Sequence, residues 1–94
     1  MIWLYILECR DGSYYTGTTR RPLEVRVGEH NAGRFNGYTA RRRPVRLVYG
    51  EQFVDPRDGI AAERQVKGWG RAKKLALIEG RFDVLATLAR RHGR

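Results

Sequence analysis

The chain has 94 residues, of which 41% are hydrophobic, so it has the size of one domain with a single modest core, and a second domain is excluded. Nineteen Lys and Arg against ten Asp and Glu give a formal net charge of +9. Such an excess favours a polyanionic partner, with nucleic acid first. A membrane surface is disfavoured because neither a basic amphipathic helix with a strong apolar face nor a lipidation signal is present.

The first nine residues are apolar but lack a basic leader and run into a turn, so we expect neither a signal peptide nor a transmembrane span. The single cysteine, Cys9, rules out an internal disulfide and fits a reducing cytoplasm. We therefore expect a soluble cytoplasmic protein with one domain over residues 1–94. Its core is expected at about 1–80, with a C-terminal helix at about 81–92.

Residues 2–9 form an apolar run of strand length, and Asp11-Gly12 supplies a turn before residues 13–17. This pattern predicts a β-hairpin, which can form in two registers. A two-residue turn puts Tyr5 and Tyr15 on opposite faces. A three-residue loop with Gly12 in the left-handed region pairs residue 7 with residue 15 and puts both tyrosines on one face. We expect the second register.

The next segment, Pro22 to Asn31, is predicted to be a short helix, since proline is favoured in the first helical turn and Asn-Ala-Gly is a plausible stop. Leu23 and Val27 are four residues apart and share one face. Arg26 and His30 share the adjoining face. We expect the first pair to pack against the core and the second pair to be available for chemistry.

Residues 33–44 are too rich in Gly and Pro for a regular element and are predicted to form a basic loop. The alternation of Val45, Leu47 and Tyr49 predicts a third strand through about Phe53. Helical spacings then predict helices from Asp55-Pro56 through Trp69, from Arg71 to Ile78, and after Gly80. The order is ββαβααα. It favours an α+β fold, a small three-stranded antiparallel sheet flanked by helices, over a parallel α/β fold.

Five sequence features lie along the chain in an order typical of one family. They are Trp3-Leu4-Tyr5, Tyr15-Thr16-Gly17, the helix with Leu23 to Arg26 and Glu29 to Asn31, the loop and strand from Tyr38 to Tyr49, and the helix from Ala62 to Trp69 followed by Arg71 to Lys74. In these features the chain resembles the GIY-YIG nuclease family, and more closely its small stand-alone bacterial members of the UPF0213 type. The first motif lacks the glycine of the family name and the second lacks the isoleucine.

The resemblance implies a divalent-metal-dependent endonuclease that hydrolyses DNA phosphodiester bonds. Its expected substrate is single-stranded or structured DNA in repair or recombination, and its expected cofactor is one Mg²⁺ or Mn²⁺ ion. The implied catalytic residues are Tyr5, Tyr15, Arg26, His30 and Glu63.

Glu63 is the expected metal ligand, because a hard cation can be held through one carboxylate, several waters and a phosphate oxygen. The alternative is an ordinary exposed ion pair between Glu63 and Lys67, four residues later on the same helix. Arg26 presents a planar fork of donors that suits a phosphate whose negative charge grows in the transition state. A solvated helix arginine is the alternative for Arg26.

The tyrosines are the expected base and orienting group, although a phenol with a pKa of about 10 needs nearby cations to act at neutral pH. The resemblance implies that one tyrosine takes a proton from water while the other orients the water, and we take Tyr5 as the base. His30 is expected to relay the proton or to hold the phosphate, or alternatively to be hydrogen-bonded at the sheet edge. Thr18 stands where some relatives carry a lysine.

Two basic clusters are expected to contact phosphates. The first contains Arg34, Arg41, Arg42 and Arg43, and the second Lys67, Arg71, Lys73 and Lys74. Within the loop, Phe35 and Tyr38 are expected either to stack on unpaired bases or to pack beneath the loop.

Three functions are compatible with this sequence. The first is the endonuclease, with DNA as partner and a further protein that supplies specificity. The second is a non-catalytic module that binds DNA or RNA on the same fold. The third is a protein-interaction domain for an acidic partner. The intact set of Tyr5, Tyr15, Arg26 and Glu63 favours the enzyme, because a pure binder needs no lone acid in a basic groove.

Overall fold

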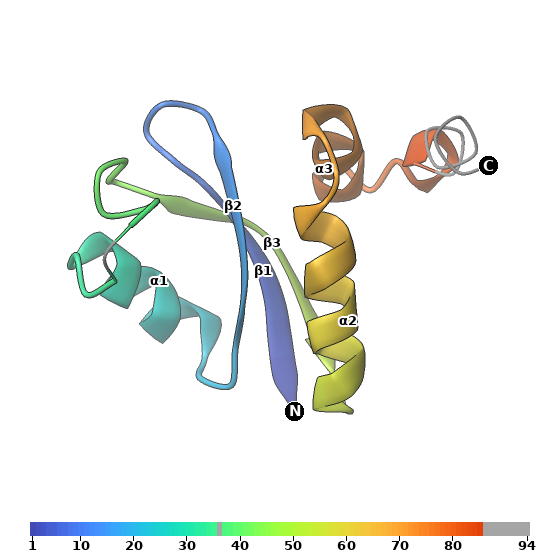
Figure 1. Cartoon of the computed structure of the whole chain (residues 1–94), viewed down its shortest axis with the longest axis horizontal. Helices are drawn as coiled ribbons and strands as arrows, with labels where there is room; N and C mark the ends of the chain where they lie inside the picture. Colours follow the sequence, from blue (N-terminus) through green and yellow to red (C-terminus); the bar gives the residue numbers. More distant parts are fainter. Residues whose placement is uncertain (36, 86–94) are drawn as a thin grey trace.

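The computed structural model describes residues 1–35 and 37–85, and in it an antiparallel sheet lies between one helix on its first face and two helices on its second (Figure 1). The strands are β1 (Ile2–Glu8), β2 (Tyr14–Thr19) and β3 (Arg46–Phe53), in the spatial order β2-β1-β3. The helices are α1 (Leu23–Asn31), α2 (Pro56–Lys67) and α3 (Arg71–Ile78). The predicted α+β class and the three-stranded antiparallel sheet flanked by helices are confirmed.

The C-terminal helix expected at about 81–92 is described only at its start. Residues 82–85 are helical, and residues 86–92 lie outside the described part of the chain. Within residues 1–35 and 37–85, no helix is long and apolar enough to cross a membrane.

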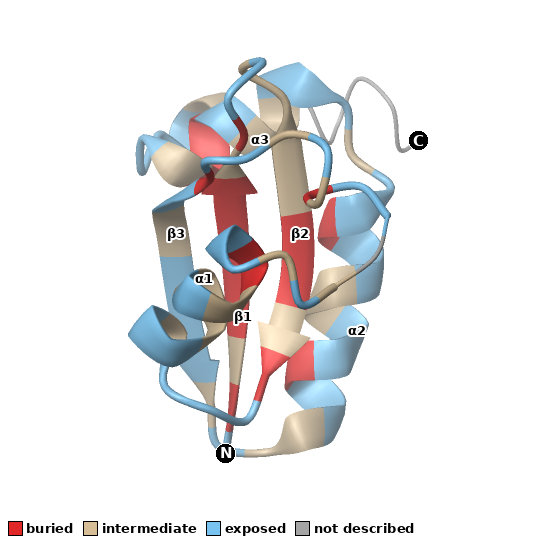
Figure 2. Cartoon of the chain, turned by 90° about the vertical axis from the view of Figure 1, so that its left-hand side faces the viewer, coloured by how far each residue is buried: buried red, intermediate tan, exposed pale blue. Residues whose placement is uncertain are grey.

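Strand β1 is the central strand and is buried on both of its faces (Figure 2). Tyr5 and Leu7 point to the side of α1, where Leu23 and Val27 pack against them. The alternate residues of β1 point to the side of α2 and α3. There Leu4 and Ile6 form a core with Val66 and Leu77. A strand covered on both faces needs apolar residues at consecutive positions, which explains the continuous apolar run of β1.

Strand β3 departs from the simple alternation predicted for Val45, Leu47 and Tyr49. Leu7 pairs with Leu47 and Ile6 pairs with Tyr49, so Val48 is an extra residue at a β-bulge. The bulge reverses the direction of the following side chains. Tyr49 therefore packs with the α2 and α3 core, whereas Val45 packs with the α1 core.

Helix α1 also differs from its prediction in one respect. Leu23 and Val27 pack against the sheet as expected, but His30 is buried as well. The expectation that Leu23 and Val27 pack while Arg26 and His30 stay available was therefore wrong for His30. The reason is the following loop, which folds back so that Phe35 and Thr39 contact the imidazole.

Candidate active site

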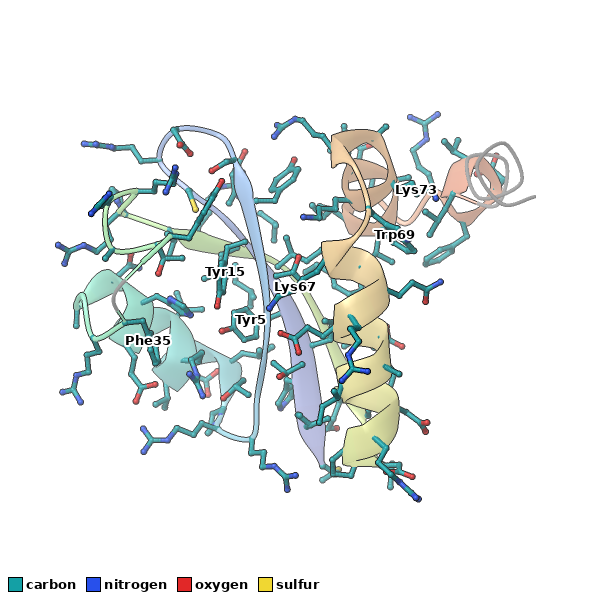
Figure 3. All side chains as sticks on the ribbon, in the orientation of Figure 1. Tyr5, Tyr15, Phe35, Lys67, Trp69 and Lys73 are labelled. Carbon is teal, nitrogen blue, oxygen red and sulfur yellow. The ribbon has the colours of Figure 1, made fainter. Side chains whose placement is uncertain are left out.

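The hairpin brings the two tyrosines together on the α1 face of the sheet. Gly12 has a φ of 85°, and Leu7 pairs with Tyr15, which confirms the three-residue loop and the predicted register. The ring centroids of Tyr5 and Tyr15 are 6.4 Å apart, and Figure 3 shows both side chains near β2.

Gly17 allows Tyr5 to reach across β2. A Cβ atom on Gly17 would lie 2.7 Å from the hydroxyl oxygen of Tyr5 and 3.2 Å from Cε2 of Tyr15. The first contact is sterically forbidden and the second is tight, so the ring of Tyr5 occupies space that any other residue at position 17 would fill. Because β2 is an edge strand, this arrangement carries a side chain of the central strand toward the unpaired edge of the sheet.

The hydroxyl of Tyr5 begins a buried hydrogen-bond chain. It lies 2.9 Å from Nε2 of His30, and Nδ1 of His30 lies 2.8 Å from Oγ1 of Thr39. The exposed fractions of Tyr5, His30 and Thr39 are only 2%, 2% and 3%. A neutral imidazole donates through one nitrogen and accepts through the other, so it can join both hydroxyl groups. Thr39 could not be recognised from the sequence, because it is a single threonine within an arginine-rich loop.

Burial keeps both titratable groups of this chain neutral. It raises the pKa of Tyr5, with a further increase from Tyr15 and from Glu63 and an opposing decrease from Arg26. Burial also lowers the pKa of His30, and the positive charge of Arg26 adds to that decrease. Tyr5 is therefore a phenol and His30 a neutral imidazole at neutral pH.

Arg26 is held in place by three neighbours. Its Nε donates to Oγ1 of Thr19 at 3.1 Å, and a carboxylate oxygen of Glu29 lies 3.7 Å from the same nitrogen. Its guanidinium lies 4.9 Å from the ring centroid of Phe35. Glu29 also forms an ion pair with Arg21. These contacts restrict the rotamers of Arg26, and the role of Glu29 was not evident from the sequence.

Glu63 approaches β2 from the opposite face of the sheet. One carboxylate oxygen accepts from the hydroxyl of Thr18 at 3.4 Å, and the other lies 3.0 Å from Nζ of Lys67. The side chain of Glu63 is 19% exposed, and Lys67 extends from α2 toward β2 (Figure 3).

Three consecutive residues of β2 thus each contact one of the expected site residues. Gly17 lies under Tyr5, Thr18 donates to Glu63, and Thr19 accepts from Arg26. Side chains of neighbouring strand residues point to opposite faces, so this short segment collects groups from both layers of helices at one sheet edge. We call it the Gly17–Thr19 segment. Tyr15 stands beside it on the face of Tyr5.

The donor set at Glu63 suits a weakly held hard cation. Within the described ranges, no group of three or more His, Cys, Asp or Glu side chains could hold a metal ion. The available oxygen donors are the carboxylate of Glu63 and the hydroxyl of Thr18. On the same side of β2, the hydroxyl of Thr16 is buried without a hydrogen-bond partner among the described residues. A magnesium ion bound through one carboxylate, with water and phosphate oxygens completing its shell, fits these residues.

Most of the residues expected to bind nucleic acid have partners within the protein. Arg42 donates to Asp11 and to the carbonyl of Tyr38, and Arg43 to the carbonyl of Ala40. On the other side of the sheet, Arg71 donates to the carbonyl of Gly12, Lys73 lies over the ring of Trp69, and Lys67 pairs with Glu63. The expected residues whose side chains have no such contact within the described part of the chain are Arg34, Arg41 and Lys74.

The aromatic residues of the loop are covered on their faces. The ring of Tyr38 is stacked on the ring of Tyr15, with 6.2 Å between the two centroids. The guanidinium of Arg42 lies 3.8 Å from the centroid of the Tyr38 ring. The ring of Phe35 lies between His30 and Arg26. This geometry supports packing of the loop over stacking of these rings on nucleic-acid bases.

Comparison with known proteins defines the class of this fold and site. A family model described as the GIY-YIG catalytic domain matches residues 1–76, so the chain belongs to the GIY-YIG family, a nuclease family whose substrates are nucleic acids. The family expected from its motifs is confirmed.

The similar proteins are more narrowly of the UPF0213 type. The chain is 43% identical to a UPF0213 protein of Staphylococcus haemolyticus over 79 residues, which is 84% of this chain and 95% of the relative. It is also 43% identical to a UPF0213 protein of Lacticaseibacillus paracasei over 77 residues, or 82% and 85% of the two chains. The solution NMR structure of a UPF0213 protein from Bacillus halodurans matches with a TM-score of 0.55, 39% identity and 84% coverage of each chain.

Proposed function

We propose that this protein is a GIY-YIG endonuclease that hydrolyses DNA phosphodiester bonds with one divalent ion, Mg²⁺ or Mn²⁺. The observation that supports it is the convergence at the Gly17–Thr19 segment of two tyrosines, a guanidinium and a single carboxylate. Phosphodiester hydrolysis needs a nucleophilic water, stabilisation of negative charge on the phosphate and help for the leaving oxygen. The residues around this segment supply candidates for the first two of these needs.

Arg26 is proposed to bind the scissile phosphate. Its guanidinium stays charged and offers several parallel donors, and the contacts with Thr19, Glu29 and Phe35 reduce the conformational freedom it would lose on binding. A preorganised donor of this kind is worth most where charge develops in the transition state.

Tyr5 is proposed to accept a proton from water while it passes its own proton to His30. The raised pKa of Tyr5 argues against a free phenolate, but the hydrogen bond to Nε2 of His30 gives the departing proton a neutral acceptor. The imidazolium formed would keep its Nδ1 proton directed at Thr39. Tyr15, which is less buried than Tyr5, would orient the water.

Glu63 is proposed to anchor the divalent ion, which when bound would lower the pKa of a coordinated water and help to neutralise the phosphate. Thr18 fixes the carboxylate by donating to one of its oxygens. We further propose that the substrate is structured or single-stranded DNA formed in repair or recombination, that a protein partner adds specificity, and that the protein acts in the cytoplasm. Arg26 and the metal ion are proposed to act on the phosphate and no residue above is assigned to a base, so the chain by itself would show little sequence preference.

The test is cleavage of single-stranded, duplex and branched DNA with Mg²⁺, with Mn²⁺ or with EDTA. Glu63→Gln and Arg26→Ala are each expected to reduce the rate by about a hundredfold or more. Tyr5→Phe should reduce it more than Tyr15→Phe. The matched control is Arg64→Gln, which changes an exposed neighbour of Glu63 and should leave the rate unchanged. Equal cleavage by wild type and Glu63→Gln would show that the activity comes from a contaminating nuclease.

The second candidate function is a module that binds DNA or RNA without cleavage. It is favoured by the ion pair of Glu63 with Lys67 and by the enclosure of Tyr5, because both leave the reactive groups occupied. Binding that is independent of divalent ions, with no cleavage of any of the three DNA substrates or of RNA, would support this candidate over the nuclease.

A further inference from the structure

Lys67 is bonded to the one carboxylate that is proposed to hold the metal ion. Its Nζ lies 3.0 Å from one oxygen of Glu63, and Thr18 lies 3.4 Å from the other oxygen. The side chain of Lys67 is 53% exposed, and a pair of this kind, four residues apart on a helix, contributes little to stability. The pair matters because it engages Glu63, the proposed ligand of the metal ion.

A divalent ion and an ammonium group compete for the same oxygen of Glu63. Both are cations, so they repel each other when they share one carboxylate, and the exposed Lys67 is the more easily moved of the two. Its flexible stem allows the ammonium to leave while the backbone of α2 stays in place.

Among the described residues Lys67 pairs with no carboxylate except Glu63. Lys67 is also close enough to a second lysine, Lys74, for the two positive charges to repel each other. Another cation, Arg71 of α3, lies over the ring of Tyr14 of β2. A released ammonium in these surroundings is suited to a phosphate oxygen.

We propose that Lys67 is an exchangeable counter-ion of Glu63, which opposes binding of the divalent ion in the free protein and binds a nucleic-acid phosphate once it is displaced. Metal and nucleic acid then strengthen each other's binding, because each favours the state in which Lys67 has left Glu63, and this coupling is reciprocal. The inference rests on the proposed function, since it takes Glu63 as the metal anchor.

The first measurement is the affinity of the full chain for Mn²⁺ without nucleic acid, by electron paramagnetic resonance of the free ion. Lys67→Met should bind Mn²⁺ about fivefold more tightly than wild type, the size expected for loss of one half-exposed competing ion pair. Lys67→Arg keeps the charge and should stay within about twofold of wild type. Lys73→Met, which removes a lysine that lies over Trp69 and not at Glu63, is the control and should match wild type.

The second measurement is the fluorescence anisotropy of a labelled phosphorothioate DNA duplex, with and without Mn²⁺. Mn²⁺ should strengthen binding of the duplex to wild type and strengthen it less in Lys67→Met. Thermal melts of all variants would verify that they are folded.

Two outcomes would overturn the inference, and they differ in what else they affect. If Lys67→Met binds Mn²⁺ as wild type does while Glu63→Gln binds it more weakly, Lys67 does not compete, and the proposed metal anchor stands. If Glu63→Gln leaves Mn²⁺ binding unchanged, Glu63 is not the anchor, and both the inference and this part of the proposed function fail.

Discussion

Tyr5 and His30 are the most enclosed of the expected site residues, and the surroundings of Tyr5 decide what its hydroxyl can do. The phenol is buried against Gly17 and bonded to His30, and burial raises its pKa. A neutral phenol cannot act as a base by ionising first. It can pass a proton along a hydrogen bond, so the chemistry available to Tyr5 depends on residues that contact no substrate.

Gly17→Ala tests the close approach of Tyr5 to β2. The new methyl group would clash with the hydroxyl of Tyr5 at 2.7 Å, so we expect a loss of about 1–3 kcal/mol in the free energy of unfolding. Gly28→Ala is the matched control, because nothing lies within 4 Å of its Cβ and the change should stabilise α1 by about 0.5–1 kcal/mol. Urea unfolding measures both. Equal stability of the two variants would contradict the packing described here.

His30 makes the stability of the protein depend on pH. Its pKa in the folded chain is below the ordinary value of 6.5, so the unfolded chain takes up the proton first as the pH falls. This contribution to stability is full above about pH 6.5 and is lost as the pH falls through the lowered pKa. Urea titrations of wild type and His30→Gln, both in a His92→Gln background, should show the additional loss in wild type alone. If the free energy of unfolding changes with pH in the same way in both proteins, this role of His30 is refuted.

At the scale of elements, α1 is joined to the start of β3 by one side chain. Nδ2 of Asn31 donates to the carbonyl of Val45 at 3.0 Å, and Oδ1 accepts from the amide of Val45 at 2.7 Å. The side-chain amide of Asn31 thus makes the two hydrogen bonds to Val45 that the backbone of a neighbouring strand would otherwise make. The loop between them is closed by these bonds, which places Thr39 against His30.

Asn31→Ala removes both of these bonds and leaves the peptide groups of Val45 without partners. We expect a loss of about 1–3 kcal/mol in the free energy of unfolding and faster hydrogen exchange at the amide of Val45. Gln65→Ala, an exposed change on α2, is the control for the loss of an amide side chain. Unchanged exchange at Val45 would show that Asn31 does not hold the loop.

At the scale of the whole molecule, the basic residues behind the formal charge of +9 are of two kinds. Some make contacts within the fold, and others face solvent. Arg42 belongs to the first group, because it joins the loop to the hairpin through Asp11 and covers Tyr38. Arg41 belongs to the second, because its exposed side chain forms no hydrogen bond, ion pair or ring contact with the described residues. Net charge alone does not distinguish the two.

Arg41→Gln should weaken DNA binding and lower the slope of log K against log salt by about one, with no change in melting temperature. Arg42→Gln should lower the melting temperature, because it removes three contacts of the loop. Fluorescence anisotropy at several salt concentrations and thermal melts compare the two. If Arg41→Gln destabilises the protein as much as Arg42→Gln does, the assignment of Arg41 to solvent and of Arg42 to the fold is wrong.

Much of the fold could be predicted from local patterns. The apolar run of β1, the turn at Gly12, the helix after Pro22 and the end of α3 each depend on a few neighbouring residues, whose backbone preferences and apolar spacing act over short distances. The bulge at Val48 was not predictable in this way, since it arises from pairing with a strand about 40 residues earlier in the sequence.

The family and the identities of Tyr5, Tyr15, Arg26 and Glu63 as candidates were determined by the sequence alone, because residue types and their order define a family. Only the tertiary structure decided how these residues are arranged, with Gly17, Thr18 and Thr19 each contacting one of them and His30 buried against Thr39. The physical reason is that these contacts join different elements of the fold, and burial and hydrogen-bond partners exist only once the layers have packed. The pair of Glu63 with Lys67 lies within one helix, and the sequence had already offered it as an alternative.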